Sequence, residues 1–134
     1  MASRILVDTN VLIDVATENP HWMEWSSKQL AKGIGKLAIN LVVYGEFSFH
    51  YETIEEVELV LADLRLERLT VPYEAAFLAG KVFKRYRDRG GRRSAPLPDF
   101  FIGAHAAVED LVLLTQDSCR YREYFPTLKM ITPA

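Results

Sequence analysis

The sequence predicts an α/β fold, in which a short, mostly parallel sheet of four to five strands is buried between helices. Two observations lead to this prediction: short apolar runs recur along the chain, and segments long enough for helices separate them. The runs do not alternate between apolar and polar residues, which is typical of parallel strands buried on both faces. Strand–helix alternation gives an α/β sandwich with right-handed crossovers. The expected strands cover residues 4–7, 37–39, 69–71 and 111–114, with residues 130–131 as a fifth.

Signals for helix ends lie in the intervals between these runs. Thr53 and Glu56 form a capping box, which marks the start of a helix, and apolar residues follow at helical spacing. Proline is favoured at the first helical position and glycine just after the last. On that basis we expect a helix over residues 22–32 before Gly33, a helix from Pro72 to Gly90-Gly91, and a helix that opens at Pro98.

The composition indicates one globular domain covering residues 1–134. Apolar residues make up 49% of the chain and charged residues 25%, a balance that allows a packed core. Cys119 is the only cysteine, so no intramolecular disulfide can form, which fits a reducing compartment. No apolar run approaches the roughly 18–20 residues that span a bilayer, and Asp8 interrupts any signal-peptide core. We therefore expect a cytoplasmic protein that does not contact a membrane.

Four acidic residues lie where this arrangement of strands would bring them together. Asp8 directly follows the first strand, and Asp117 lies just past a later one. Glu46 sits in a helical stretch, residues 41–49, after the second strand, and Asp99 lies in the first turn of the last predicted helix. In open parallel sheets, ligand sites form outside the carboxyl ends of the strands. We expect the four carboxylates to meet at that edge.

Each of these acids also has an ordinary structural explanation. Asp8 could cap the helix that begins near Val11, and Asp99 could stabilise the macrodipole of its helix. Glu46 could face solvent, and Asp117 could belong to a turn. Together they favour a metal site, because converging carboxylates repel one another and a divalent cation relieves the repulsion. Mg²⁺ takes hard oxygen ligands, and a site of this kind can activate a water against a phosphodiester.

Residues 5–14, Ile-Leu-Val-Asp-Thr-Asn-Val-Leu-Ile-Asp, resemble the opening of PIN-domain nucleases, in particular the VapC-type toxins of toxin–antitoxin pairs. Three further blocks similar to the family follow in the family's order, at residues 44–47, 98–106 and 114–117. The tail, residues 121–126, is similar to the end of those toxins. Each block alone is weakly specific, but four in order are strongly so, and the resemblance covers essentially the whole chain.

The resemblance implies a metal-dependent endoribonuclease with a three-layer α/β/α sandwich. The residues that would hold Mg²⁺ or Mn²⁺ for the hydrolysis of RNA are Asp8, Glu46, Asp99 and Asp117, with polar support from Thr9, Asn10 and Thr115. The resemblance also implies a small antitoxin protein that covers the active site, and a homodimer. One departure from the family is that Pro98 and the bulky pair Phe100-Phe101 flank Asp99, which would alter the cleft there.

One segment is strongly basic, although the whole chain has a formal net charge of −2. Residues 81–93 hold seven basic residues against one acidic residue, which leaves nine basic and 17 acidic residues for the rest. The segment is either a solvated helix end, where cations are favoured, or a phosphate-binding edge that draws RNA to an acidic protein. For a nuclease we favour the second interpretation and expect RNA contacts from Arg85, Arg89, Arg92 and Arg93.

Other polar and aromatic residues receive structural interpretations. The histidines have no spacing suited to zinc, and Asp14 is explained as an outward-facing helix residue. We expect Trp22, Met23 and Trp25 to pack into the core, with a protein-binding patch as the alternative.

Three alternatives to a nuclease differ in the residues they need. A phospho-signalling receiver needs an acid after a middle strand and a lysine after a late one, but Asn40 follows Ile39 and no lysine follows Leu114. A haloacid-dehalogenase-type phosphatase needs Asp-x-Asp after the first strand, and position 10 is Asn. A non-catalytic PIN-like module that binds RNA or protein stays open as the third alternative. Incubation with RNA, with and without EDTA, separates that module from an enzyme.

Overall fold

Five parallel strands form a single sheet in the computed structural model, which describes residues 3–91 and 97–133. Their order across the sheet is β3-β2-β1-β4-β5, and every neighbouring pair is parallel. The strands are β1 (Ile5–Val7), β2 (Leu37–Asn40), β3 (Glu67–Leu69), β4 (Val112–Leu114) and β5 (Met130–Ile131). The predicted parallel sheet is confirmed, including its fifth strand.

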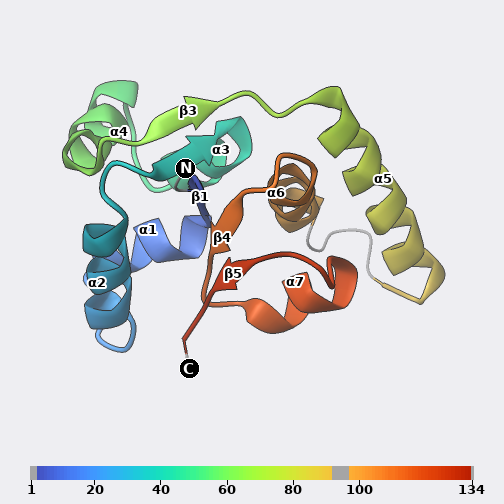
Figure 1. The fold of residues 1–134 in the computed structure, drawn as a ribbon. Coiled ribbons are helices and arrows are strands. Elements are labelled where there is room, and N and C mark those ends of the chain that lie inside the picture. The colour runs from blue at the N-terminus through green and yellow to red at the C-terminus, as the bar shows by residue number, and fades with distance from the viewer. Residues whose placement is uncertain (1–2, 92–96, 134) are drawn as a thin grey trace.

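Helices cover this sheet and complete a three-layer α/β/α sandwich. They are α1 (Thr9–Ala16), α2 (Met23–Gly33), α3 (Leu41–Ser48), α4 (Ile54–Leu61), α5 (Tyr73–Asp88), α6 (Leu97–Val108) and α7 (Ser118–Tyr124), with a 3₁₀ turn, η1 (Ala62–Leu64), after α4. Figure 1 shows α1, α2 and α4 on one side of the strands and α5, α6 and α7 on the other. None of the helices in the described part of the chain is long and apolar enough to cross a membrane.

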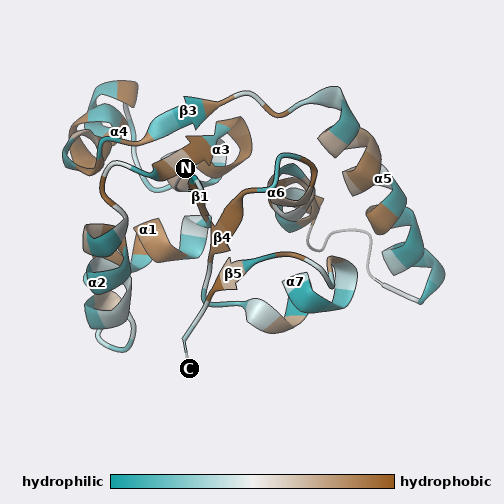
Figure 2. Ribbon diagram, viewed as in Figure 1, coloured by the Kyte–Doolittle hydropathy of each residue, from teal (hydrophilic) through white to brown (hydrophobic). Residues whose placement is uncertain are grey.

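The central strands are buried on both faces, which explains why their sequences do not alternate. Leu6 and Val7 of β1 are fully inaccessible to solvent, and so are Leu113 and Leu114 of β4. Successive side chains of a strand point to opposite faces, so each face of these strands needs an apolar covering. In Figure 2, β4 is brown, whereas β3 at the edge of the sheet is largely teal.

The third strand lies two residues earlier than predicted. β3 pairs with β2 so that Leu69 lies opposite Asn40, and the predicted strand at residues 69–71 therefore begins where the observed strand ends. β3 is an edge strand, and its first two residues, Glu67 and Arg68, are exposed. Charged residues are favoured on edge strands because they discourage pairing with other chains. Hydrophobicity is consequently a poor guide to this strand.

Several helix ends differ from the prediction by one position. Gly33 is the last residue of α2 rather than the residue after it, and the positive φ of 93° occurs at Gly35. A Cβ on Gly33 would lie 2.5 Å from Cδ2 of Leu37, so this glycine serves a close approach of α2 to β2. Pro72 is the extended N-cap of α5, which its φ of −72° also suits, and Pro98 is the second residue of α6.

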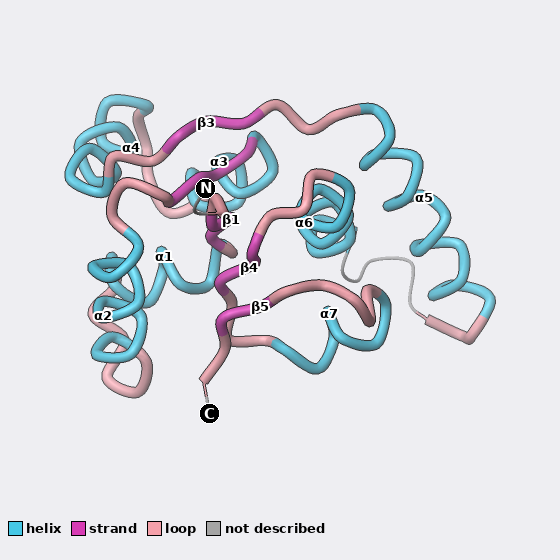
Figure 3. The backbone as a smooth tube through the Cα atoms, viewed as in Figure 1, coloured by secondary structure: helices cyan, strands magenta, loops and turns pink. Residues whose placement is uncertain are grey.

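The chain changes direction across the sheet between β1 and β4. It builds outward from β1 through β2 to β3 and then returns through α5 and α6 to place β4 on the other side of β1 (Figure 3). A reversal of this kind leaves a crevice at the carboxyl ends of the two strands, the usual place of a ligand site in an open α/β sheet. Asp8 follows β1 and Thr115 follows β4, so both lie at this reversal.

A close contact between α6 and Phe125, the residue that follows α7, provides a test of the packing. A Cβ on Gly103 would lie 2.5 Å from Cε2 of the buried Phe125 ring. We expect Gly103→Ala to lower the free energy of unfolding by about 1–3 kcal/mol, because the ring must shift in a packed core. Gly80→Ala in α5 is the matched control. A Cβ there meets nothing within 4 Å, so helix propensity should raise stability by up to about 1 kcal/mol. Equal urea midpoints for the two variants would contradict the packing.

Candidate active site

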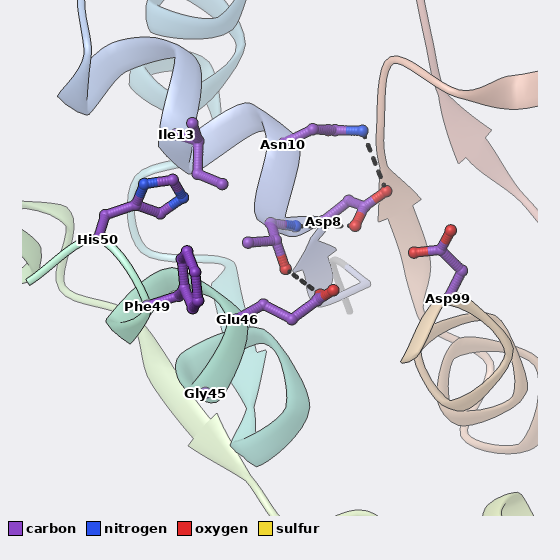
Figure 4. A pocket seen from close by; sticks show the side chains of 9 residues that line it. Asp8, Asn10, Ile13, Gly45, Glu46, Phe49, His50 and Asp99 are labelled. Carbon is purple, nitrogen blue, oxygen red and sulfur yellow. Dashed lines mark hydrogen bonds between the residues drawn. The ribbon is translucent and has the colours of Figure 1, made fainter. Parts of the chain in front are cut away.

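Three of the four predicted acids line one open cavity at the reversal point of the sheet. The cavity has a volume of about 590 Å³, and Asp8, Glu46 and Asp99 form part of its wall. The acids come from three separate elements, namely the end of β1, α3 and α6. Figure 4 shows their carboxylates directed toward one space, with Asp99 facing Asp8 across it.

Asp8 is almost completely buried and accepts hydrogen bonds from three parts of the fold. It is the N-cap of α1, where its Oδ1 accepts from the Thr9 N–H at 2.8 Å. Its Oδ2 accepts from the Thr115 hydroxyl at 2.7 Å and from the Tyr121 hydroxyl at 3.1 Å. Nδ2 of Asn10 donates to the same oxygen at 3.4 Å. The capping role expected for a lone Asp8 is confirmed, and the same carboxylate also faces the cavity.

Glu46 is positioned by a helix that starts directly from the sheet. Asn40 ends β2 and caps α3, because its Oδ1 accepts from the Val43 N–H at 3.0 Å. Its Nδ2 lies 3.0 Å from Nδ1 of His105, a buried residue of α6. The Thr9 hydroxyl donates to Oε1 of Glu46 at 2.7 Å and so ties α3 to α1. Glu46 is therefore positioned by the anchored start of α3 and by one hydrogen bond from α1.

Asp99 is paired with a cation from α7. The Arg120 guanidinium donates to Oδ2 of Asp99 at 2.5 Å, and the Arg120 side chain is 43% exposed. The pair links the start of α6 to the start of α7. It also places a positive charge beside the cavity that sequence analysis did not anticipate.

The three carboxylates of the cavity share a raised pKa. Burial raises the pKa of Asp8 to about 7, because the loss of water outweighs its hydrogen bonds, and the charge of Asp99 adds to the rise. Burial is also the main reason that the pKa of Glu46 is raised, with Asp99 contributing again. For Asp99 burial raises the pKa in spite of the ion pair with Arg120. The ionised forms of these acids are thus held at an electrostatic cost.

Asp117 lies near Asp99 but outside the cavity wall. It occupies the N-cap position of α7 without a capping bond from its side chain, and its N–H donates to the Thr115 hydroxyl at 3.0 Å. After burial and the Arg120 pair, the charge of Asp117 is a further cause of the pKa shift at Asp99. The structure therefore gathers Asp8, Glu46 and Asp99 and places Asp117 at the margin.

The donor set is suitable for a hard divalent cation, although its geometry is looser than that of a finished metal site. Within residues 3–91 and 97–133, no three acidic, histidine or cysteine side chains are close enough together to hold an ion. The available donors are carboxylate oxygens, which Mg²⁺ and Mn²⁺ prefer. The raised pKa values show that added positive charge would be favourable here. The chemistry of the residues fits such an ion, and Arg120 supplies part of the compensating charge.

The predicted polar neighbours all contact the acids, and α7 adds two residues that sequence analysis missed. Thr9, Asn10 and Thr115 make the hydrogen bonds described above. Arg120 and Tyr121 belong to a helix that was not predicted. Burial and the nearby carboxylates raise the pKa of Tyr121 well above its usual value, so its hydroxyl stays a donor to Asp8. The sequence held one signal for these two residues, namely their place in the chain shortly after β4. A helix that starts after Asp117 has its first turn at the edge of the sheet where β4 ends.

The structure describes only part of the basic segment, residues 81–91. Arg85 is exposed on α5. Arg89 lies 3.8 Å from a Glu123 carboxylate oxygen and stands 5.9 Å from the centre of the Tyr124 ring, so it packs on α7. Arg92 and Arg93 fall outside the described residues.

Two interpretations of residues near α1 and α2 need correction. Asp14 does not face outward but is 5% exposed, and its Oδ2 accepts a hydrogen bond from the buried Ser26 hydroxyl at 2.8 Å, which joins α1 to α2. Trp25 packs against the core as expected. Trp22 and Met23, at the start of α2, are partly buried like Trp25 but do not pack against the core cluster.

Comparison with known families decides what kind of domain this is. The PIN domain family matches residues 5–122, which is most of the chain. The chain belongs to the PIN-domain family. Membership in this family agrees with the three-layer sandwich. It excludes the two alternatives of a phospho-signalling receiver and a haloacid-dehalogenase-type phosphatase. No curated protein matches the sequence.

Several solved structures share the PIN fold of this chain at low sequence identity. A chain of VapBC2 from Rickettsia felis, bound to a DNA fragment from its promoter, has a TM-score of 0.71 and 20% identity, with 97% of this chain and 98% of that chain covered. DNA-bound VapBC from Salmonella typhimurium gives 0.70 and 21%, with 98% of both chains covered. FitAcB from Neisseria gonorrhoeae gives 0.65 and 16%, with 95% and 96% covered. At these identities the likeness concerns the fold.

The raised pKa of Asp8 predicts how the stability of this PIN domain depends on pH. Between about pH 4 and 7 the folded protein keeps a proton on Asp8 that the unfolded chain has lost. Stability should therefore fall as the pH rises through that range, by at most about 1.4 kcal/mol per pH unit from this group, and level off above pH 7. Asp8→Asn removes this titration. In EDTA, the free energy of unfolding of the variant should therefore rise relative to that of the wild type between pH 5 and pH 8.

Urea unfolding at a series of pH values measures this difference. Asp63→Asn, at an exposed position in η1, is the matched control and should run parallel to the wild type. If the free energies of unfolding of the wild type and Asp8→Asn changed with pH in the same way between pH 5 and 8, the raised pKa of Asp8 would be wrong.

Proposed function

We propose that this PIN domain is a metal-dependent endoribonuclease that hydrolyses RNA phosphodiester bonds and acts as the toxin of a type II toxin–antitoxin pair. The observation that carries the nuclease proposal is the cavity at the reversal point of the sheet. There, Asp8, Glu46 and Asp99 converge from three elements. Carboxylates forced together with raised pKa values are expected at a functional site rather than at a purely structural one.

The residues that would hold Mg²⁺ or Mn²⁺ are Asp8, Glu46 and Asp99, with Asp117 at the margin. When bound, such an ion supplies an activated water and stabilises the charge that develops on the phosphate. In the hydrolysis a water oxygen bonds to phosphorus, the bond from phosphorus to one ribose oxygen breaks, and that oxygen leaves with a proton. The products are one RNA end with a phosphate and one with a hydroxyl.

The chain's own residues set up this chemistry before any substrate arrives. The hydroxyls of Thr115 and Tyr121 fix the orientation of Asp8, and the Thr9 hydroxyl fixes that of Glu46. Fixed carboxylates need no rearrangement when charge develops, which is the main source of electrostatic catalysis. The half-exposed Arg120 guanidinium beside Asp99 is suited to a phosphate oxygen of the RNA.

The basic segment supplies the long-range attraction for RNA in this proposal. Arg85, Arg89, Arg92 and Arg93 would contact phosphates and counter the net charge of −2. Arg89 packs against α7, the helix that carries Arg120 and Tyr121, and this contact supports a path from the basic segment to the cavity.

Toxin function and the partners rest on the structures that share the fold. The Rickettsia felis and Salmonella typhimurium structures contain VapBC, and a further similar structure, from Klebsiella pneumoniae, is a toxin–antitoxin complex. We therefore propose a small antitoxin protein as the partner of this chain. A homodimer is proposed as its assembly on the family resemblance alone. The antitoxin would cover the cavity, where an Arg or Lys from its chain could pair with the carboxylates.

Substitution of the acids tests the enzyme. Asp8→Asn and Asp99→Asn each remove a negative ligand with little change of shape, so cleavage of total RNA in Mg²⁺ or Mn²⁺ should fall at least 100-fold, the order of magnitude expected when a catalytic group is lost. EDTA should abolish the wild-type activity in the same gel assay. Asp63→Asn is the control and should cleave like the wild type.

Two outcomes of that assay would count against the proposal. Cleavage that survives EDTA would remove the metal from it. RNA that is bound but never cut by the wild type in either metal would favour the non-catalytic PIN-like module.

Expression in growing bacteria tests the toxin. Induction of the chain alone should arrest growth, Asp8→Asn should not, and co-expression of the small protein encoded beside it should restore growth. Normal growth with abundant wild-type protein would contradict toxin function but leave RNA cleavage in vitro unaffected.

A further inference from the structure

The cavity that contains the acids has a second, apolar half. Phe49, His50 and Ile13 line the same space as Asp8, Glu46 and Asp99. In Figure 4 Phe49, His50 and Ile13 lie on one side and Asp99 on the other, with Asp8 and Glu46 between them. A phosphate-cleaving site needs only the acidic half, so the apolar half calls for a separate explanation.

Phe49 is unusually open for a phenylalanine. It is the C-cap residue of α3, and the residue is 88% exposed. Its ring meets that of His50 edge to face, with 5.8 Å between the centroids, and this leaves most of the Phe49 surface uncovered. A ring held open at the mouth of a cavity gains little for folding, because almost none of its surface is removed from water.

An exposed glycine of α3 also lines the cavity. A Cβ built on this residue, Gly45, would meet nothing within 4 Å. A larger residue would thus project into open space rather than into the protein. The total volume of about 590 Å³ lies within the 300–1,000 Å³ range of sites that hold small organic groups.

We propose that Phe49, with His50 and Ile13, forms a base-stacking subsite for an unpaired nucleotide next to the scissile phosphate. This rests on the proposed nuclease function, which places the phosphate at the acids. An aromatic ring stacks on any base, because every base has a π-face, and single-stranded RNA is commonly recognised by such stacking. In a duplex the base would be paired and stacked on its neighbours and could not enter.

The subsite differs from Phe77, another exposed aromatic residue of the chain. Phe77 is 67% exposed on α5, but Lys81 Nζ lies over its ring at 5.1 Å, and Phe77 does not line the acid-containing cavity. Only a ring that shares a cavity with the acids can bind a base while the adjoining phosphate reaches them. Phe77 therefore provides a matched control.

Binding of short RNAs to the full chain tests the subsite. The protein carries Asp99→Asn so that the RNA stays intact, and the probes are fluorescent ten-nucleotide RNAs, one with all its bases and one abasic throughout. Phe49→Ala should weaken binding of the base-bearing RNA by roughly 5- to 100-fold and leave the abasic RNA unchanged. Phe49→Trp should restore binding, Gly45→Leu should weaken it by filling the cavity, and Phe77→Ala should have no effect. Because Phe49 is exposed, the melting temperature should not change.

The outcomes separate this proposal from the nuclease proposal. If Phe49→Ala binds both RNAs as the Asp99→Asn parent does, the subsite is wrong, whether or not the wild type cleaves RNA. If the base-dependent loss is seen but the wild type cuts no RNA, the subsite stands as an RNA-binding site and the nuclease proposal fails. If Phe49→Ala releases a co-purified antitoxin and leaves RNA binding unchanged, the cavity receives a protein side chain, and the base-stacking subsite is overturned.

Discussion

The burial of one carboxylate, that of Asp8, is the constraint on which the rest of this structure depends. Its two oxygens accept hydrogen bonds from a backbone N–H of α1, a hydroxyl that follows β4 and a hydroxyl of α7. Those donors are far apart in the sequence and meet only because β1 and β4 are neighbours in the sheet. A buried charge without such donors would be far more costly, so the segments that supply them must be in place for the native state to form.

The cavity shows that this part of the molecule is not optimised for stability. Burial raises the pKa of Asp8, Glu46 and Asp99, and Asp99 adds repulsion to each of the other two. A protein selected only to be stable would place apolar or neutral residues here. Proteins accept unfavourable local arrangements of this kind mainly where function requires them. Arg120 offsets part of the cost without leaving the surface.

Sequence analysis was most successful where one physical signal acted alone. The unalternating runs around Leu6 and Leu113 located central strands because both faces need apolar contacts. The same rule misplaced β3, since an edge strand has one free side and carries charge. Gly33 was interpreted as a helix cap, whereas its role is a close approach to Leu37 that only the folded structure reveals.

The candidate site was predictable to a similar extent. Asp8 and Asp117 could be placed because they follow strands, and strand ends meet at one edge of a parallel sheet. The contributions of Arg120 and Tyr121 depend on the direction of α7, for which the local sequence holds no strong signal. Asp14 was thought to face outward because its partner, Ser26, lies on another helix. Side chains whose role is a contact between distant segments cannot be recognised from either segment alone.

The hydrogen bond between Asn40 and His105 determines how two of the acids are spaced. Because Oδ1 of Asn40 accepts from the Val43 N–H, its Nδ2 must donate to Nδ1 of the imidazole, which is consequently the unprotonated nitrogen. Burial lowers the pKa of His105 and keeps the ring neutral, as this arrangement requires. The bond acts as a fixed spacer between the helices of Glu46 and Asp99. It lies outside the cavity wall, so it joins the two helices without occupying any of the space between the acids.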